Sequence, residues 1–182
     1  MPHTHPRAPA RFDAAAQADL TACRAALREG SYTFYAASLV LPASVREPAC
    51  ALYAFCREAD DAVDQGTDAG LAVQQLRERL DRVYAGEAAG PLSRVADRAL
   101  ASVVLHFGIP RAMLDALIEG FEWDVHGRSY DTLDALSDYA ARVAGSVGAM
   151  MALLMGVREP QALARACEMG VAMQLSNIAR DV

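Results

Sequence analysis

The sequence lacks the patterns that mark several common protein classes. It contains no GxGxxG nucleotide-binding pattern, no repeat of fixed period and no two-residue alternation typical of strands. Its four cysteines form no CxxC and pair with no histidine, so we expect reduced packing residues rather than a disulfide or zinc site. A net charge of −6 argues against nucleic acid as a general partner. An anionic substrate would then need a metal ion or local arginines.

Long apolar runs are also missing. The charge-free stretch 143–157 is shorter than the roughly 18 apolar residues of a membrane span, so we expect a buried helix there. Gly145, Ser146 and Gly148 lie in it, and each glycine weakens a helix by about 1 kcal/mol relative to alanine. Such small residues leave room either for another backbone or for a ligand chain. The sequence alone leaves both interpretations open.

The first eleven residues are rich in proline and histidine and have no apolar core. They do not resemble a signal peptide, and we expect a disordered tail over 1–11 in which His3 and His5 bind no metal.

The rest of the chain has the composition of one globular domain. Hydrophobic residues make up 53% of the sequence and charged residues 22%, enough for a substantial core in 182 residues. Helical spacing of apolar residues predicts a single all-α domain over 1–182. The expected helices cover 12–28, 43–64, 71–84, 92–107, 110–128, 132–138, 143–157 and the residues from 160 onwards. Between the first two, Ser31 either caps a short helix or aims its hydroxyl, with that of Thr33, at a ligand.

The segment 52–64, with the sequence LYAFCREADDAVD, carries the first candidate site. It reads as helix, and Tyr53, Arg57, Asp60 and Asp64 follow an i, i+4, i+7, i+11 pattern along one face. Carboxylates one turn apart repel each other unless a cation lies between them. Mg²⁺ suits this position because it binds through one or two carboxylates together with substrate phosphates. A solvated acidic patch is the alternative.

A second polar row lies at the end of the sequence. Gln174, Asn177 and Asp181 follow an i, i+3, i+7 pattern, and apolar residues lie beside them. Two polar rows on apolar helices suggest facing walls of one cavity. Asp124, three residues after Phe121, faces either the same cavity or a neighbouring arginine.

Four segments together resemble the phytoene/squalene synthase family, the head-to-head prenyl synthases. They read SYTFYAASLVLP from Ser31, LYAFCREADDAVD from Leu52, YAARVAGSVG from Tyr139 and QLSNIARD from Gln174. The second and fourth segments are highly specific, and the bacterial phytoene synthases are the most similar branch. The resemblance implies an isoprenoid (terpenoid) synthase fold, a helical bundle in which two aspartate-rich motifs face each other across a central cavity and bind diphosphates with Mg²⁺ or Mn²⁺.

The resemblance also implies roles for individual residues. Asp60 and Asp64 from the first motif, with Asn177 and Asp181 from the second, would bind metal. Asp60, Asp64, Tyr53 and Arg57 would be catalytic, and the substrate-binding residues would be Ser31, Thr33, Phe34, Tyr53, Arg57, Tyr139, Val143, Gly148, Gln174 and Asn177. Thr33 stands where the family often has serine, and the hydroxyl is retained.

The implied activity is that of a transferase of carotenoid and isoprenoid biosynthesis, a prenyltransferase of the 15-cis-phytoene synthase type. It would condense two geranylgeranyl diphosphates to phytoene through prephytoene diphosphate. Squalene or dehydrosqualene synthesis from farnesyl diphosphate is one alternative, and a non-catalytic helical fragment or assembly partner is another. The family's second motif continues past Asp181 to a further acidic residue and further helices, so we expect a C-terminally truncated chain. We expect a cytoplasmic location, with peripheral membrane contact for the apolar product.

Overall fold

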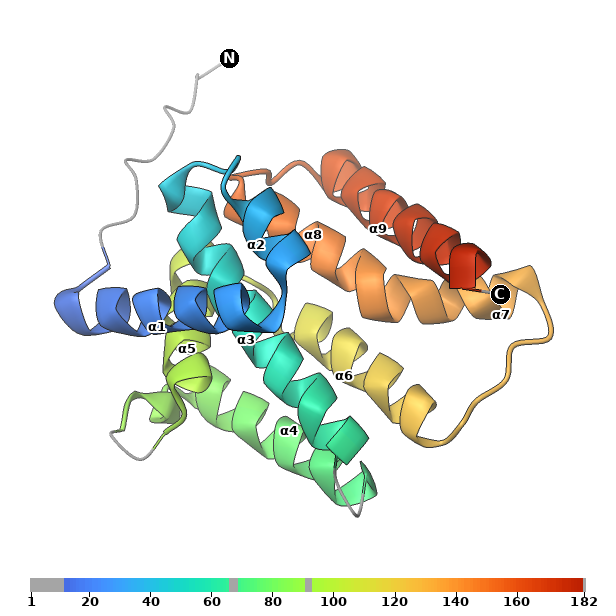
Figure 1. The fold of residues 1–182 in the computed structure, drawn as a ribbon, viewed down its shortest axis with the longest axis horizontal. Coiled ribbons are helices and arrows are strands. Elements are labelled where there is room, and N and C mark those ends of the chain that lie inside the picture. The colour runs from blue at the N-terminus through green and yellow to red at the C-terminus, as the bar shows by residue number, and fades with distance from the viewer. Residues whose placement is uncertain (1–11, 66–68, 91–92, 182) are drawn as a thin grey trace.

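A computed structural model describes residues 12–65, 69–90 and 93–181, and every regular element in these ranges is helical (Figure 1). The predicted tail over 1–11 lies outside the described residues. The elements in chain order are α1 (Ala14–Gly30), α2 (Tyr32–Ser38), α3 (Ala43–Gln65), α4 (Ala69–Ala85), the 3₁₀ turn η1 (Glu87–Ala89), α5 (Val95–Phe107), α6 (Arg111–Val125), α7 (Leu133–Ala140), the π-helical segment η2 (Ala141–Gly145), α8 (Ser146–Leu154) and α9 (Pro160–Asp181).

Local side-chain chemistry accounts for several helix ends. The carboxylate of Asp13 accepts a hydrogen bond from the Ala16 amide at 2.8 Å, and the Thr132 hydroxyl accepts one from the Ala135 amide at 3.1 Å. Each side chain satisfies an amide that has no partner inside its helix. Gly108 ends α5 with a φ of 65°, a left-handed conformation that favours glycine.

Helix α3 lies at the centre of the core. It packs against α1, α4 and α5, and it also contacts α6 and α8 (Figure 1). Phe55 on α3 is fully buried among leucines contributed by the surrounding helices. The buried leucines include Leu20, Leu76, Leu80, Leu100 and Leu114. One face of α3 is therefore committed to the core, and other faces remain for a site.

The charge-free stretch 143–157 does not form the single α-helix expected from sequence. The chain runs from α7 through η2 into α8, and the π turn at Ala141–Gly145 adds one residue to the helical repeat. The expected burial is confirmed for much of α8, including Met150 and Leu153. No helix among the described residues is long and apolar enough to cross a membrane.

Close backbone contact explains the glycines of this region. A Cβ on Gly148 would collide with the Ala166 carbonyl oxygen on α9, and a Cβ on Gly170 would collide with the Ala144 carbonyl oxygen on η2. A Cβ on Gly145 would lie 2.7 Å from the Cys167 Sγ. These small residues therefore make room for a neighbouring backbone, the first of the two interpretations left open by the sequence. Figure 1 shows α9 alongside α8, as this contact requires.

All four cysteines are free, as predicted. Cys23 and Cys50 are buried in the core, while Cys56 and Cys167 are half-buried. Burial raises the pKa of the Cys23 thiol to about 12, and it also raises the pKa of Cys50.

Candidate active site

The first acidic row lies on the C-terminal half of α3. Asp60 and Asp64 belong to this helix, four residues apart, but their side chains lie outside the described part of the chain. Arg57 is described, and its guanidinium forms an ion pair with Asp61, at 3.0 Å from Nη2 to Oδ1 and 3.2 Å from Nε to Oδ2. About half of the Arg57 side chain is exposed to solvent. Asp61 is not among the residues predicted from the sequence, although its i+4 spacing from Arg57 is a signal that the sequence contains.

The junction of α1 and α2 lies beside the Tyr53 side of α3. Ser31 caps α2 by accepting a hydrogen bond from the Phe34 amide at 3.3 Å, which confirms the capping interpretation. The rings of Phe34 and Tyr53 lie 5.9 Å apart. A Cβ on Gly30 would lie 3.1 Å from the Tyr53 hydroxyl. The structure therefore brings Ser31, Phe34 and Tyr53 together from segments about twenty residues apart, and it adds Gly30, which the sequence reading missed.

Thr33, in the first turn of α2, is exposed. The exposed Phe34 ring lies on the same short helix.

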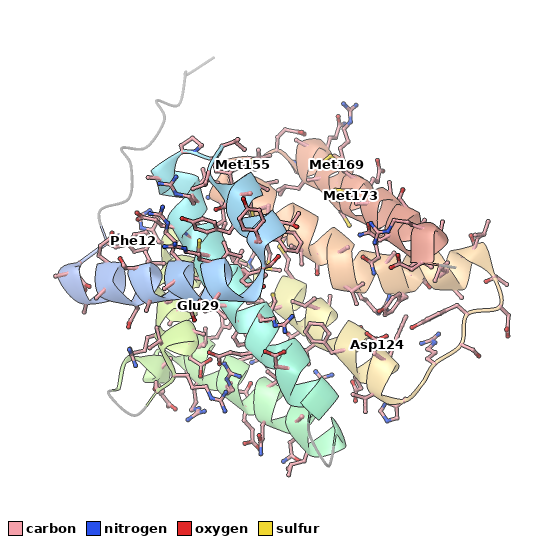
Figure 2. All side chains as sticks on the ribbon, viewed as in Figure 1. Phe12, Glu29, Asp124, Met155, Met169 and Met173 are labelled. Carbon is pink, nitrogen blue, oxygen red and sulfur yellow. The ribbon has the colours of Figure 1, made fainter. Side chains whose placement is uncertain are left out.

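A second group of predicted residues lies where α6 meets α7. The Tyr139 hydroxyl donates a hydrogen bond to Asp124 Oδ2 at 2.9 Å, and the rings of Tyr130 and Tyr139 lie 5.0 Å apart. Figure 2 shows Asp124 near the end of α6, where the chain turns toward α7. Burial raises the pKa of Tyr130, and the charge of Asp124 raises it further. Asp124 thus binds one of the residues predicted to line the cavity.

Val143 and Gly148 are placed by helix packing. Val143 lies in η2, and its Cγ1 would be 2.5 Å from a Cβ on Gly120 of α6. Gly120 therefore has no room for a side chain, because Val143 occupies that space. Gly148 lies on α8, and a Cβ at this position would point toward α9.

The second polar row lies along α9. Gln174 is half-buried, whereas Asn177 and Asp181 are exposed. Asp181 pairs with the adjacent Arg180 at 2.9 Å from Nε to Oδ1. Helix α9 is placed mainly by its contacts with α8, η2 and α7. Met169 and Met173, both largely exposed, show that this helix also presents apolar side chains to solvent (Figure 2).

The metal ligands that the two polar rows could supply are all oxygen atoms. Carboxylates and an amide suit a hard divalent cation such as Mg²⁺, and neither thiol nor imidazole belongs to the set. Among the side chains that the structure describes, no three His, Cys, Asp or Glu residues form a group that could hold a metal ion. This statement does not cover the carboxylates of Asp60 and Asp64, because their side chains lie outside the described part of the chain.

The fold is that of the all-α terpenoid synthases. The structure superposes on squalene synthase HpnC from Alicyclobacillus acidocaldarius with a TM-score of 0.83 and 29% identity, covering 91% of this chain and 62% of the other. It superposes on a dehydrosqualene synthase with a TM-score of 0.80 and 31% identity, covering 91% and 57%.

The chain belongs to the squalene/phytoene synthase family, whose sequence model matches residues 27–182. It is 56% identical over 177 residues to a phytoene synthase of Cereibacter sphaeroides, covering 92% of this chain and 49% of the relative. It is 43% identical over 165 residues to a 15-cis-phytoene synthase of a Paracoccus species, covering 86% and 54%. The chain thus spans about half the length of these curated relatives.

Proposed function

We propose that the protein is a phytoene synthase that condenses two geranylgeranyl diphosphates head to head, through prephytoene diphosphate, to phytoene. The observation that carries the proposal is the meeting of Ser31, Phe34 and Tyr53 beside the Arg57 and aspartate row of α3. This arrangement supports a site in which hydroxyl, guanidinium and aromatic groups act on one substrate. The 56% identity to a phytoene synthase supports this product over others of the family.

Arg57 and Ser31 are suited to hold a diphosphate. The Arg57–Asp61 pair is exposed, and such pairs contribute only about 0.2–1 kcal/mol, so a diphosphate can compete for the guanidinium. Arg57 would then offset the negative charge that grows on the leaving diphosphate as its C–O bond breaks. The Ser31 oxygen accepts from the Phe34 amide, which leaves its own proton free to be donated to a phosphate oxygen.

Asp60 and Asp64 of α3, with Asn177 and Asp181 of α9, would hold Mg²⁺. The metal, when bound, would neutralise the diphosphate as a Lewis acid. Gln174 lies one turn before Asn177 and would line the same wall.

Aromatic and aliphatic groups would enclose the allylic cation. The double bond of the second substrate attacks this cation to give a cyclopropyl diphosphate, which ionises again, rearranges and loses a proton. Phe34 and Tyr139 offer ring faces that stabilise a cation by about 0.5–2 kcal/mol each. Val143 and the charge-free helix α8 would supply apolar surface that excludes water from the cation.

The test is Mg²⁺-dependent release of diphosphate from geranylgeranyl diphosphate, with phytoene identified by chromatography. Asp60→Asn and Asp64→Asn should each abolish turnover and leave the helical circular dichroism unchanged. Asp115→Asn is the matched control, because Asp115 is a helical aspartate on α6 that forms an i, i+4 pair with Arg111 and belongs to neither polar row. Retained turnover in both α3 variants would contradict the metal assignment.

Squalene or dehydrosqualene synthesis is the second candidate, because both superposed structures carry those names. Parallel assays with farnesyl diphosphate distinguish the two by the C20 to C15 rate ratio. A non-catalytic helical protein would release diphosphate from neither substrate. Peripheral membrane contact for the apolar product is part of the same proposal, and sedimentation with vesicles in the presence of substrate measures it.

A further inference from the structure

A cluster of charged residues, with a buried arginine–aspartate pair at its centre, joins α3 to α4 and α5 on the side away from the acidic row. Arg79 of α4 donates to Asp97 of α5 through Nε, at 3.0 and 3.1 Å, and through Nη2 at 2.7 Å. The side chains of Arg79 and Asp97 are only 7% and 5% exposed. The same Nη2 donates to Glu58 Oε2 of α3 at 2.9 Å, and Arg94 donates to that oxygen at 3.3 Å.

This cluster has little freedom to rearrange. Buried charges are costly unless they are paired and hydrogen-bonded, so Arg79 must keep its acceptors. Its guanidinium also lies 5.2 Å from the centre of the Phe55 ring, one turn before Glu58 on α3. Arg79 is therefore fixed by Asp97 and Phe55, and it offers Glu58 a hydrogen-bond donor at a defined place.

The position of Glu58 in the sequence connects this cluster to the candidate site. An α-helix turns about 100° per residue, which places Tyr53, Arg57, Asp60 and Asp64 about 100–160° around α3 from Glu58, all on the same side. A carboxylate held at Glu58 would therefore restrain the rotation of the helix and the direction in which that row faces. A rotation of about 20° moves an atom at the helix surface, about 5–6 Å from the axis, by about 2 Å. Mg²⁺ tolerates no such displacement, because it requires near-octahedral ligands at about 2.0–2.1 Å.

We propose that Glu58 is a positioning residue, which acts through buried Arg79 to hold the aspartate row of α3 in the orientation that binds the divalent cation. This inference rests on the proposed function of that row. Apolar packing of α3 is the competing explanation of its orientation, and in that case the Glu58 carboxylate would have no effect on the metal.

The direct test measures Mn²⁺ binding by electron paramagnetic resonance, with inorganic diphosphate present, so that turnover is not required. Glu58→Gln keeps the shape of the side chain and removes its charge. We expect its Mn²⁺ dissociation constant to rise about three- to tenfold, less than the 10–100-fold typical of groups that bond metal ligands directly. Glu58→Asp keeps the charge but shortens the reach, and a smaller rise is expected.

Glu122→Gln is the matched control. Glu122 is also a glutamate that accepts from an arginine of α4, Arg77 Nη2 at 2.7 Å, and its side chain is 38% exposed, as is that of Glu58. It lies on α6 and pairs with α4, so among the described residues it makes no contact that would hold the orientation of α3, and its variant should bind Mn²⁺ as the wild type does. Melting temperatures of all variants show whether each is folded at the assay temperature.

The outcomes separate this inference from the proposed function. Unchanged Mn²⁺ affinity in folded Glu58→Gln, or an equal loss in Glu122→Gln, would overturn the positioning role. Absence of Mn²⁺ binding by the wild type would overturn the metal site and the positioning role together. Wild-type Mn²⁺ binding without release of diphosphate from a prenyl substrate would overturn the proposed reaction only.

Discussion

The hydroxyl of Tyr53 lies against Gly30, so close that a methyl group on Gly30 would be 3.1 Å from the oxygen. This separation is tighter than an ordinary van der Waals contact. The hydroxyl is thereby held at the junction of α1 and α2, where the Phe34 ring lies 5.9 Å from the Tyr53 ring. Gly30 thus determines where a residue of the candidate site can lie.

Gly30→Ala should displace the Tyr53 hydroxyl by a few tenths of an ångström. We expect a higher KM for the prenyl diphosphate, with a change in unfolding free energy within about 1 kcal/mol, because alanine is the better helix former and partly offsets the contact. Gly90→Ala is the control, since no atom of the described residues lies within 4 Å of a Cβ at that position. Equal KM values in the two variants would show that the hydroxyl does not contact the substrate.

Arg57→Met should weaken substrate binding while leaving the fold intact. A hydrogen bond to a charged group contributes about 1.5–3 kcal/mol, so kcat/KM should fall about 10–100-fold. The exposed pair with Asp61 contributes little, and the unfolding free energy should change by less than about 1 kcal/mol. Arg111→Met, which removes an i, i+4 pair with Asp115 on α6 and also a pair with Asp81 of α4, should leave kcat/KM unchanged. A parallel loss in both variants would point to net charge rather than to Arg57.

The burial of Cys23 predicts a loss of stability at alkaline pH. The raised pKa, about 12 against an ordinary value of 9.0, means that the unfolded thiol ionises first as pH rises. Stability is therefore fully present below pH 9 and decreases between pH 9 and 12, by about 1.4 kcal/mol at pH 10. Urea unfolding at pH 8 and pH 10 measures this decrease. In Cys23→Ala it should be smaller by that amount, and an identical decrease in both proteins would contradict the assignment to Cys23.

Much of the fold could be predicted from sequence because its signals are local. Thr132 caps the helix that follows it, and Gly108 ends α5, as short-range rules require. The i, i+4 spacing of Tyr53 and Arg57 is likewise a property of a single helix. Such features need only neighbouring residues, and one sequence contains them.

Long-range relationships could not be predicted in this way. Arg79 meets Glu58 and Asp97 across sequence separations of 21 and 18 residues, and no periodicity marks those three as partners. The π turn at Ala141–Gly145 depends on how η2 packs against α6 and α9. Whether a glycine faces a ligand or a backbone is decided by the neighbouring helix, which the sequence alone does not locate.

Gly148 provides the sharpest test of whether a glycine faces a ligand or a neighbouring backbone. If it lines the ligand cavity, Gly148→Ala should stabilise the protein by up to about 1 kcal/mol, because alanine is the better helix former. The structure predicts the opposite sign, since the new methyl group would meet the Ala166 carbonyl oxygen of α9. Overpacking of this kind costs about 1–3 kcal/mol, and we expect Gly148→Ala to lower the unfolding free energy in urea by that amount. Gly170→Ala, which would meet the Ala144 carbonyl oxygen from the other helix, should do the same, while Gly90→Ala should not. A stabilised Gly148→Ala with impaired use of the longer prenyl substrate would instead assign this position to the cavity wall.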